Sequence, residues 1–203
     1  MRDDRGNDKH PGFGADFDAT PAPDLIAPVH AFRDWRVGSD GLVSPRTGAL
    51  WTNRLMRAHC RPQTVEEFIA PPHTAPGTGC TCGIHAYYEP SDAASKVDWR
   101  GVSGIVTVWG RIEAYSVGLR AEYARVEALG TYHRWTRRQK EAVAGVAADL
   151  GVELVDLYDL VSAAERFGTR MPSELIPGGP RRAEKSGPAA TAPRNERRIV
   201  VGA

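Results

Sequence analysis

The sequence predicts an α+β fold, in which a small antiparallel β-sheet (a β-rich module) carries a metal-tied loop and is followed by two C-terminal helices. Three patterns lead to this prediction. Side chains alternate between apolar and polar along 104–126, as they do in antiparallel strands. Apolar residues recur every three or four positions after residue 136, as in amphipathic helices. All three cysteines lie between 60 and 82, in a stretch rich in proline and glycine.

Composition divides the chain of 203 residues into four parts. Residues 1–26 are polar and lack periodicity, which predicts a disordered tail. Residues 27–130 are expected to form the β-rich module with the Cys/His loop, and residues 131–168 a helical segment packed on it. Residues 169–203 carry seven Lys/Arg against three Glu among many Pro, Gly and Ala, and are predicted to be a disordered basic tail.

The N-terminal half of the β-rich module contains two strand signals. The segment 29–37 has the pattern of an edge or half-buried strand, and the turn residues 39–41 return the chain through 42–43. A mixed segment from 49 to 60 indicates a further strand. The side chains expected to be buried in these strands are Val29, Ala31, Trp35, Val37, Trp51, Leu55 and Ala58.

The second half of the module contains the strongest local signal, a β-hairpin. Strands are predicted at 104–115 and 118–126, because both alternate and because Gly118 can adopt the left-handed conformation of a hairpin bulge. The aromatic segment 83–88 indicates a strand that leaves the cysteine loop, and 91–99 has a helical pattern. Four charged residues of the hairpin are interpreted as an ordinary cross-strand charge ladder: Arg111, Glu113, Arg120 and Glu122.

Two helices are predicted after the hairpin. Thr136 and Gln139 form a capping box at the start of the first helix, and Gly151 marks its end. The segment 152–157 is a short strand or a connector. A second apolar stripe over 157–164 then predicts the second helix.

Composition and charge exclude several classes of protein. A net charge of +1 and a pI near 7.8 do not by themselves indicate a partner. The first 20 residues lack the apolar run of a signal peptide, and no apolar stretch is long enough to cross a bilayer. We therefore expect a reducing cytoplasm, where thiols bind metal more often than they form disulfides. No nucleotide-binding loop and no hydrolase nucleophile elbow is present in the sequence.

Cysteine and histidine residues gathered in one loop favour a tetrahedral zinc site. The candidate ligands are Cys60, His73, Cys80 and Cys82. Two sulfurs bound to one zinc ion lie only about 3.8 Å apart, whereas alternate residues of a straight strand are separated by roughly 6.6 Å. The backbone must therefore bend between Cys80 and Cys82. Gly79 and Gly83 stand on either side of this pair and permit the bend.

Other interpretations of the same residues stay open. Free thiols pack like small hydrophobic groups, so the three cysteines can be inert. Alternatively, Cys80 or Cys82 is a reactive nucleophile, with His73 or His85 as its base. Cysteines also hold iron–sulfur centres. A disulfide between Cys80 and Cys82 is disfavoured, because its small ring would be strained and one cysteine would stay unpaired.

Three segments carry a family resemblance: H-T-A-P…C-T-C-G-I-H-A at 73–86, V-W-G-R-I-E at 108–113 and G-L-R-A-E-Y-A at 118–124. They resemble a group of small uncharacterised actinobacterial proteins, and the likeness covers roughly residues 30–130. An aromatic residue usually stands at the position of His85 in that group, which argues against His85 as a ligand. No activity is attached to the group. The resemblance therefore implies one β-rich module and no particular function.

A basic and aromatic segment precedes the first predicted helix. Its cations lie at the helix N-terminus, where the macrodipole disfavours them by about 0.3–1 kcal/mol each. Such a sequence indicates an anion site, where phosphate binds at a helix N-terminus beside arginines. The simpler interpretation is a solvated helix start with the tryptophan packed beneath it. The candidate anion or nucleic-acid ligands are Arg134, Trp135, Arg137 and Arg138.

The first functional hypothesis is a non-enzymatic binding or accessory module. In it, a structural zinc ion braces a small sheet that presents a surface to a protein or nucleic-acid partner. A loop rich in proline and glycine has little apolar surface to order it, and a zinc site can supply that order. The second hypothesis is a thiol-dependent enzyme that uses a cysteine of the loop with a nearby histidine. The two differ in whether all three sulfurs converge on one point with His73, or one thiol lies open beside an imidazole.

Overall fold

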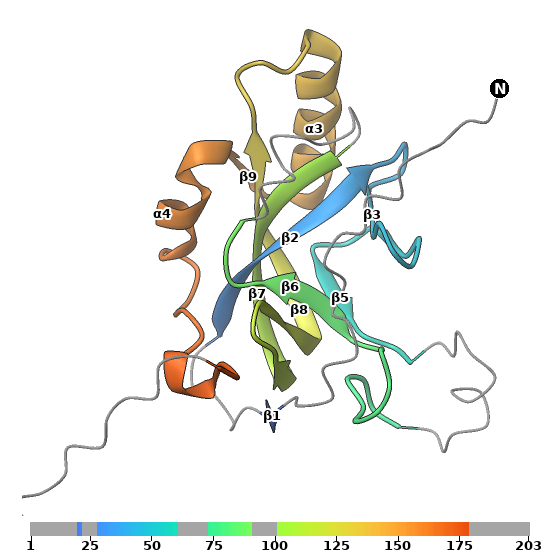
Figure 1. The fold of residues 1–203 in the computed structure, drawn as a ribbon. Coiled ribbons are helices and arrows are strands. Elements are labelled where there is room, and N and C mark those ends of the chain that lie inside the picture. Colours follow the sequence, from blue (N-terminus) through green and yellow to red (C-terminus); the bar gives the residue numbers. More distant parts are fainter. Residues whose placement is uncertain (1–19, 22–27, 61–72, 91–100, 179–203) are drawn as a thin grey trace, which may run out of the picture.

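Two long antiparallel strands form the centre of the fold, as the alternating sequence predicts (Figure 1). The computed structural model describes residues 20–21, 28–60, 73–90 and 101–178. Strands β7 (Gly101–Ala114) and β8 (Gly118–Thr131) are joined near the predicted place, through residues 115–117. The predicted left-handed bulge at Gly118 is wrong, because Gly118 belongs to β8 and is not among the glycines with a positive φ. Both strands extend beyond the predicted ranges, because neighbouring strands pair with their outer residues.

Within the described residues, seven further strands join these two in one sheet. They are β1 (Thr20–Pro21), β2 (Val29–Val37), β3 (Leu42–Val43), β4 (Leu50–Trp51), β5 (Leu55–Arg57), β6 (Ile84–Tyr87) and β9 (Glu153–Asp156). β2 pairs with β7, β6 and β3, while β5, β6 and β9 pair with β8. β9 runs parallel to β8, and the other strand pairs are antiparallel. The predicted fold class, α+β with a mainly antiparallel sheet, is confirmed.

Two helices follow the hairpin, as predicted: α3 (Arg137–Leu150) and α4 (Leu160–Ala164), the latter preceded by the 3-10 turn η1 (Leu157–Asp159). The Thr136 side chain accepts a hydrogen bond from the Gln139 backbone, and the Gln139 side chain accepts one from the Thr136 backbone. The helix ends at Gly151, which has a left-handed φ of 63°. Along the described chain, no helix combines the length and the hydropathy of a membrane span.

The sheet curls around a core. β2, β7, β8 and β6 pair around a ring, so one face of these strands points inward. The rings of Trp35 and Trp51 meet edge to face inside this core, with 5.5 Å between their centroids. α3 adds Val143 and Val146 to the same core. We call this the inner face of the sheet.

α4 covers part of the outer face. Phe32 lies next to an inward-pointing residue on β2 and therefore points the opposite way. Together with Ile105 and Ala128 it packs against Leu160 and Ala164 of the helix. α3 and α4 thus pack against different faces of the sheet (Figure 1).

Two strand predictions are corrected by the structure. Of the two alternatives for 29–37, the edge strand is wrong, because neighbouring strands pair with both edges of β2. The strand is partly buried, and Val29, Ala31 and Trp35 share its core face as predicted. The segment 49–60 contains two short strands with different partners, since β4 pairs with β3 and β5 pairs with β8. This change of partner shifts the alternation, so Trp51 is buried as predicted whereas Leu55 is 54% exposed. Ala58 is half-buried.

The predicted C-terminal tail begins later than expected. The backbone of Thr169 makes two hydrogen bonds, of 2.9 and 3.1 Å, with the residues at the start of β2. Met171 is 6% exposed, and the 3-10 turn η2 (Ser173–Leu175) follows it. Residues 169–178 therefore lie against the core, which corrects the boundary predicted after residue 168. Their apolar residues are too irregularly spaced to show a helical or strand period.

The other predicted tail is described only in part. Within 1–26, strand β1 pairs with β7 through Thr20↔Ala114 and Pro21↔Glu113. The rest of 1–26, the segment 179–203 and the helical pattern at 91–99 lie outside the described residues. The predictions made for them stay predictions.

Candidate metal centre

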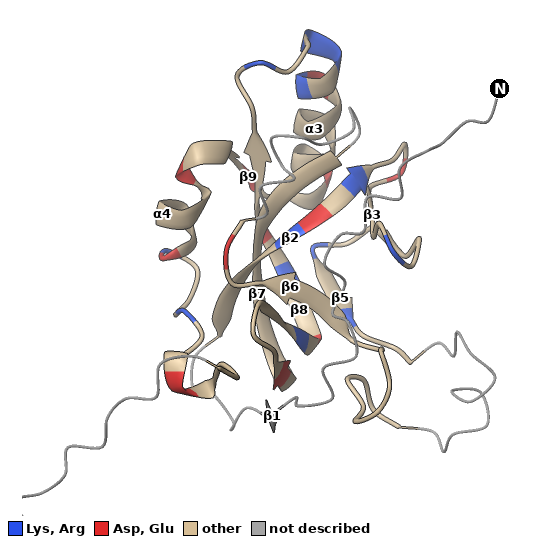
Figure 2. Ribbon diagram, in the orientation of Figure 1, with Lys and Arg blue, Asp and Glu red and all other residues tan. Residues whose placement is uncertain are grey.

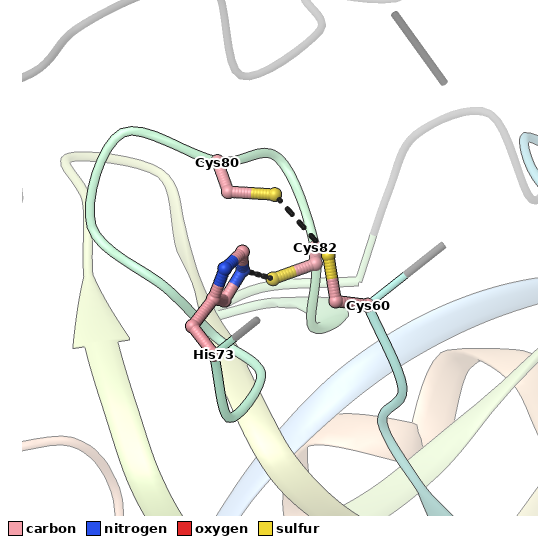
Figure 3. A group of neighbouring side chains, drawn as sticks. All are labelled: Cys60, His73, Cys80 and Cys82. Atoms are coloured by element: carbon pink, nitrogen blue, oxygen red, sulfur yellow. Dashed lines mark hydrogen bonds between the residues drawn. The ribbon is translucent and has the colours of Figure 1, made fainter. Parts of the chain in front are cut away.

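Four side chains converge near the start of β6 (Figure 3). Cys60 follows β5, while the other three lie in residues 73–83, which we call the metal loop. The ligand atoms of all four lie within 4.8 Å of one another. Cys60 Sγ is 3.7 Å from Cys80 Sγ, and His73 Nε2 is 3.3 Å from Cys82 Sγ. Two sulfurs on one zinc ion lie about 3.8 Å apart, so the group is close enough to hold a metal ion.

Glycine residues give the metal loop its shape. Gly79 and Gly83 have φ angles of 74° and 121°, which residues with a Cβ rarely adopt, and they turn the backbone as the sequence predicts. Gly77 lies against the imidazole, because a Cβ there would be 2.1 Å from His73 Cδ2. The Gly77 N–H donates to Cys82 Sγ over 3.3 Å. Hydrogen bonds of this kind orient the ligands of metal sites.

A buried arginine on β8 holds the metal loop against the sheet. Arg120 Nη1 donates hydrogen bonds to the carbonyl oxygens of Cys80 and Cys82, the second over 3.1 Å. Its Nη2 pairs with Glu113 on β7, and the two side chains are 6% and 7% exposed. Tyr115 OH donates to the same carboxylate over 3.2 Å. Arg120 therefore joins the cysteine turn to two neighbouring strands.

The sequence interpretation of these charges as an ordinary ladder is corrected, because the pair of Arg120 and Glu113 is buried. The hairpin register places the two residues directly opposite each other, and their place on the polar sides of the two strands could be predicted from the alternation. The burial of the two residues could not be predicted, since the cysteine turn that covers Arg120 comes from a distant part of the chain.

The protonation state of Cys82 bears on its chemistry. Burial raises the pKa of the Cys82 thiol to about 12; the Gly77 N–H lowers it in part, and the Cys80 and Cys60 thiols raise it again. Without a metal, Cys82 is therefore a neutral thiol at neutral pH rather than a nucleophilic thiolate. A metal ion that binds there must displace the proton.

His85 lies outside the ligand group. Its Nε2 donates a hydrogen bond to the Thr81 carbonyl over 3.0 Å. Burial lowers the pKa of His85 to about 4; the hydrogen bond to Thr81 raises it in part, and Arg33 and Arg120 lower it. The imidazole is therefore neutral at neutral pH. Within the described residues, His73 is the histidine that the fold brings to the three cysteines.

The candidate anion residues lie at the start of α3, away from the metal loop (Figure 1). The Arg137 side chain is 91% exposed and pairs with Glu141 at 2.6 Å. Trp135 is half-buried and packs against the core, as the simpler interpretation expects. Trp135 and Arg138 also line a cavity of about 320 Å³. Anion or nucleic-acid binding by these residues and Arg134 stays a prediction.

No protein-family model, no curated protein and no solved structure matches the chain. The resemblance to the actinobacterial group therefore stays a prediction.

Proposed function

We propose that the chain is a zinc-binding accessory module without enzymatic activity, in which a structural zinc ion holds the metal loop on the sheet. The observation that carries the proposal is the convergence of the four candidate ligands, whose donor atoms lie within 4.8 Å of one another. Three sulfurs and one imidazole nitrogen suit zinc and do not suit magnesium or calcium, which prefer oxygen ligands.

A structural role is supported by the number of protein ligands. Structural zinc sites are closed by four protein side chains, whereas catalytic sites keep one position for water or substrate. This chain supplies all four ligands. The site also joins two separate segments, one that follows β5 and one that precedes β6, and both of these strands pair with β8. A bound zinc ion would connect these two segments.

The partner of the module, in our proposal, is a protein or a nucleic acid that contacts the sheet. Arg120 and the metal loop brace one end of β7 and β8, which suits a surface that must keep its shape on binding. The cysteines of the site are not joined in a disulfide, as metal binding requires. A reducing compartment such as the cytoplasm keeps thiols in that state.

The test is the metal content of the full chain after purification without added metal. We expect about one equivalent of zinc per chain, and a large drop in melting temperature when a chelator removes it. His73→Ala should lose the zinc. His59→Ala is the matched control, because His59 is exposed and adjacent to Cys60 but lies outside the ligand group. Metal-free protein with an unchanged melting temperature would contradict the proposal.

A thiol-dependent enzyme is the second candidate function. The contact of 3.3 Å between His73 Nε2 and Cys82 Sγ favours it, since a base beside a thiol can activate it. The raised pKa of Cys82 opposes it. Alkylation by iodoacetamide at neutral pH separates the two candidates. An activated thiol reacts at once in the purified protein, whereas zinc-bound thiols stay protected until a chelator is added.

A further inference from the structure

Five exposed or half-buried side chains form a group on the outer face of the sheet, which we name the β5 patch: Leu55, Arg57, Trp109, Tyr123 and Arg125. The strand register brings them together. Leu55 lies opposite Arg125. Tyr123 lies opposite Arg57 on one side and Trp109 on the other. Residues directly opposite each other on neighbouring strands point to the same face.

This face is opposite the core. The residues that alternate with the patch are Met56, Val108 and Ala124, and they pack inside the core. Further along β7 and β8, α4 covers the outer face by packing on Ile105 and Ala128. β5 and α4 stand on opposite sides of the molecule (Figure 1), so α4 does not reach the patch.

The patch is open in the described part of the chain. Leu55 is 54% exposed, and the side chains of Arg57 and Arg125 are 54% and 49% exposed. Trp109 and Tyr123 are half-buried, so part of each ring reaches the surface. Two large aromatic rings and two arginines are thus accessible on one strip of sheet.

The rings and cations form an ordered row. The Trp109 and Tyr123 rings are stacked, with 5.8 Å between their centroids and 10° between their planes. The Arg57 guanidinium lies 5.4 Å from the centroid of the Tyr123 ring. Arginine and aromatic side chains in such contact present π faces and positive charge together.

The carboxylates beside the patch do not cancel this charge at the surface. Glu127 is 1% exposed and pairs with both Arg54 and Arg125. Glu122 is 14% exposed and pairs with Arg57 at 3.3 Å. The arginines of these pairs are far more exposed than the glutamates. The charge accessible to solvent is therefore mainly that of the guanidinium groups. Figure 2 shows such basic residues on β5 and β8.

We propose that the β5 patch binds single-stranded nucleic acid. The proposal rests on the proposed function, because it names the partner of the binding module. Unpaired bases stack on aromatic side chains with little regard to sequence. Trp109 at the end of the row supplies that surface, since Trp109 and Arg57 already occupy the two faces of the Tyr123 ring. Arg57 and Arg125 supply contacts to phosphate. A protein partner fits less well, because Leu55 is the one aliphatic side chain of the patch and protein interfaces need a larger apolar centre.

The test uses the full zinc-loaded chain and fluorescent oligonucleotides of about 12 nucleotides, as single-stranded RNA, single-stranded DNA and duplex DNA. We expect both single strands to bind more tightly than the duplex, whose bases are not free to stack. The RNA and DNA arms show which backbone is preferred. With two phosphate contacts, affinity should fall about sevenfold between about 50 and about 200 mM salt. A duplex that binds as tightly as the single strands overturns the proposal.

Variants locate the binding surface. Trp109→Ala should weaken binding of the single strands about tenfold, and Trp109→Phe should keep most of the affinity because a π face is retained. Arg57→Ala should lower the slope of log affinity against log salt by about 0.7. Arg166→Ala is the matched control and should bind as wild type does, because Arg166 is 57% exposed, pairs with Glu153 and lies over an aromatic ring as Arg57 does. The double variant Arg137→Ala/Arg138→Ala tests the other candidate site, at the start of α3. Melting temperatures confirm that each variant is folded.

Three further outcomes overturn the proposal: equal affinity of wild type and both Trp109 variants, loss of binding in the α3 variant alone, or equally tight binding of a labelled polyglutamate. Zinc content, measured on every sample, separates this proposal from the proposed function. A zinc-loaded chain that binds neither single strand overturns the nucleic-acid proposal alone. A chain that binds RNA through Trp109 without zinc supports it and contradicts the proposed function.

Discussion

The guanidinium of Arg120 contacts both the candidate metal centre and the sheet. It donates to the carbonyl oxygens of Cys80 and Cys82 and pairs with the carboxylate of Glu113. The planar fork of arginine can serve several acceptors at once, which a lysine ammonium at the end of a flexible stem does less well. Arg120 is therefore the residue that fixes the cysteine turn relative to β7 and β8.

Replacement of Arg120 should destabilise the fold. In Arg120→Ala, Glu113 would be left buried without its cation, so we expect the free energy of unfolding to fall by about 3–5 kcal/mol. Arg166→Ala is the matched control, since the ion pair of Arg166 with Glu153 lies at the surface. Its effect should stay within about 0.5 kcal/mol. Urea unfolding of the two zinc-loaded variants measures the difference, and equal losses would show that the buried pair has no special role.

His85 should make the fold sensitive to acid. Its pKa is lowered from 6.5 to about 4 in the folded protein, so between these values the unfolded chain binds more protons. The stability that comes from the neutral imidazole is fully present above pH 6.5 and is lost as the pH falls toward 4. His85→Gln keeps a donor for the Thr81 carbonyl and removes the titration. Unfolding curves over this pH range should diverge, with wild type losing more stability than the variant. Parallel curves would contradict the prediction, since zinc release affects both proteins alike.

At the scale of residues, the sequence could predict what the candidate ligands are but not what surrounds them. Cys80, Cys82 and their flanking glycines are close in the chain, so their geometry follows from local rules. The burial of Arg120 and the exposure of Trp109 depend on which distant segments cover each strand. No local pattern contains that information.

At the scale of elements, local signals could again be predicted from the sequence, whereas features that depend on distant segments could not. The hairpin and α3 carry their own signals, in the alternation of side chains and in the capping box with Gly151, and both were predicted. β5 and β9 are short strands whose existence depends on pairing with β8. The sequence predicted a strand near each, but it could not predict the partner. Leu55 was wrongly predicted to be buried because the partner of its strand was not known.

The metal loop should tolerate no side chain at Gly77. A Cβ there would lie 2.1 Å from His73 Cδ2, so Gly77→Ala has to displace the imidazole, and we expect loss of zinc and a lower melting temperature. Gly145→Ala is the matched control, because Gly145 is exposed in α3 and an added Cβ meets nothing within 4 Å. That variant should keep its zinc and gain up to about 1 kcal/mol. Gly77→Ala with full zinc content and unchanged melting would show that the loop holds no metal in this geometry.

At the scale of the whole molecule, the fold class could be predicted, but the closure of the sheet could not. β2 closes the ring by pairing with β7 and β6, which are far from it in sequence. Its pattern resembled that of an edge strand because charged residues such as Arg33 and Asp34 interrupt the apolar ones. Arg33 instead lies over the rings of Trp35 and Trp51. Contact with aromatic faces lets a cation occupy this interior position.

The extent of the folded unit can be measured with two truncated chains. A chain that ends at residue 178 keeps Met171 and the hydrogen bonds of Thr169, so it should melt at nearly the same temperature as the full chain. A chain that ends at residue 168 loses them. Burial of a methionine side chain contributes about 1.5–3 kcal/mol, which for a chain of this size corresponds to a fall in melting temperature of about 3–12 °C. Calorimetry of the full chain and of the two truncated chains measures these melting temperatures. Equal melting of both truncations would show that 169–178 contributes nothing, and a large fall already at 178 would contradict the predicted disorder of 179–203.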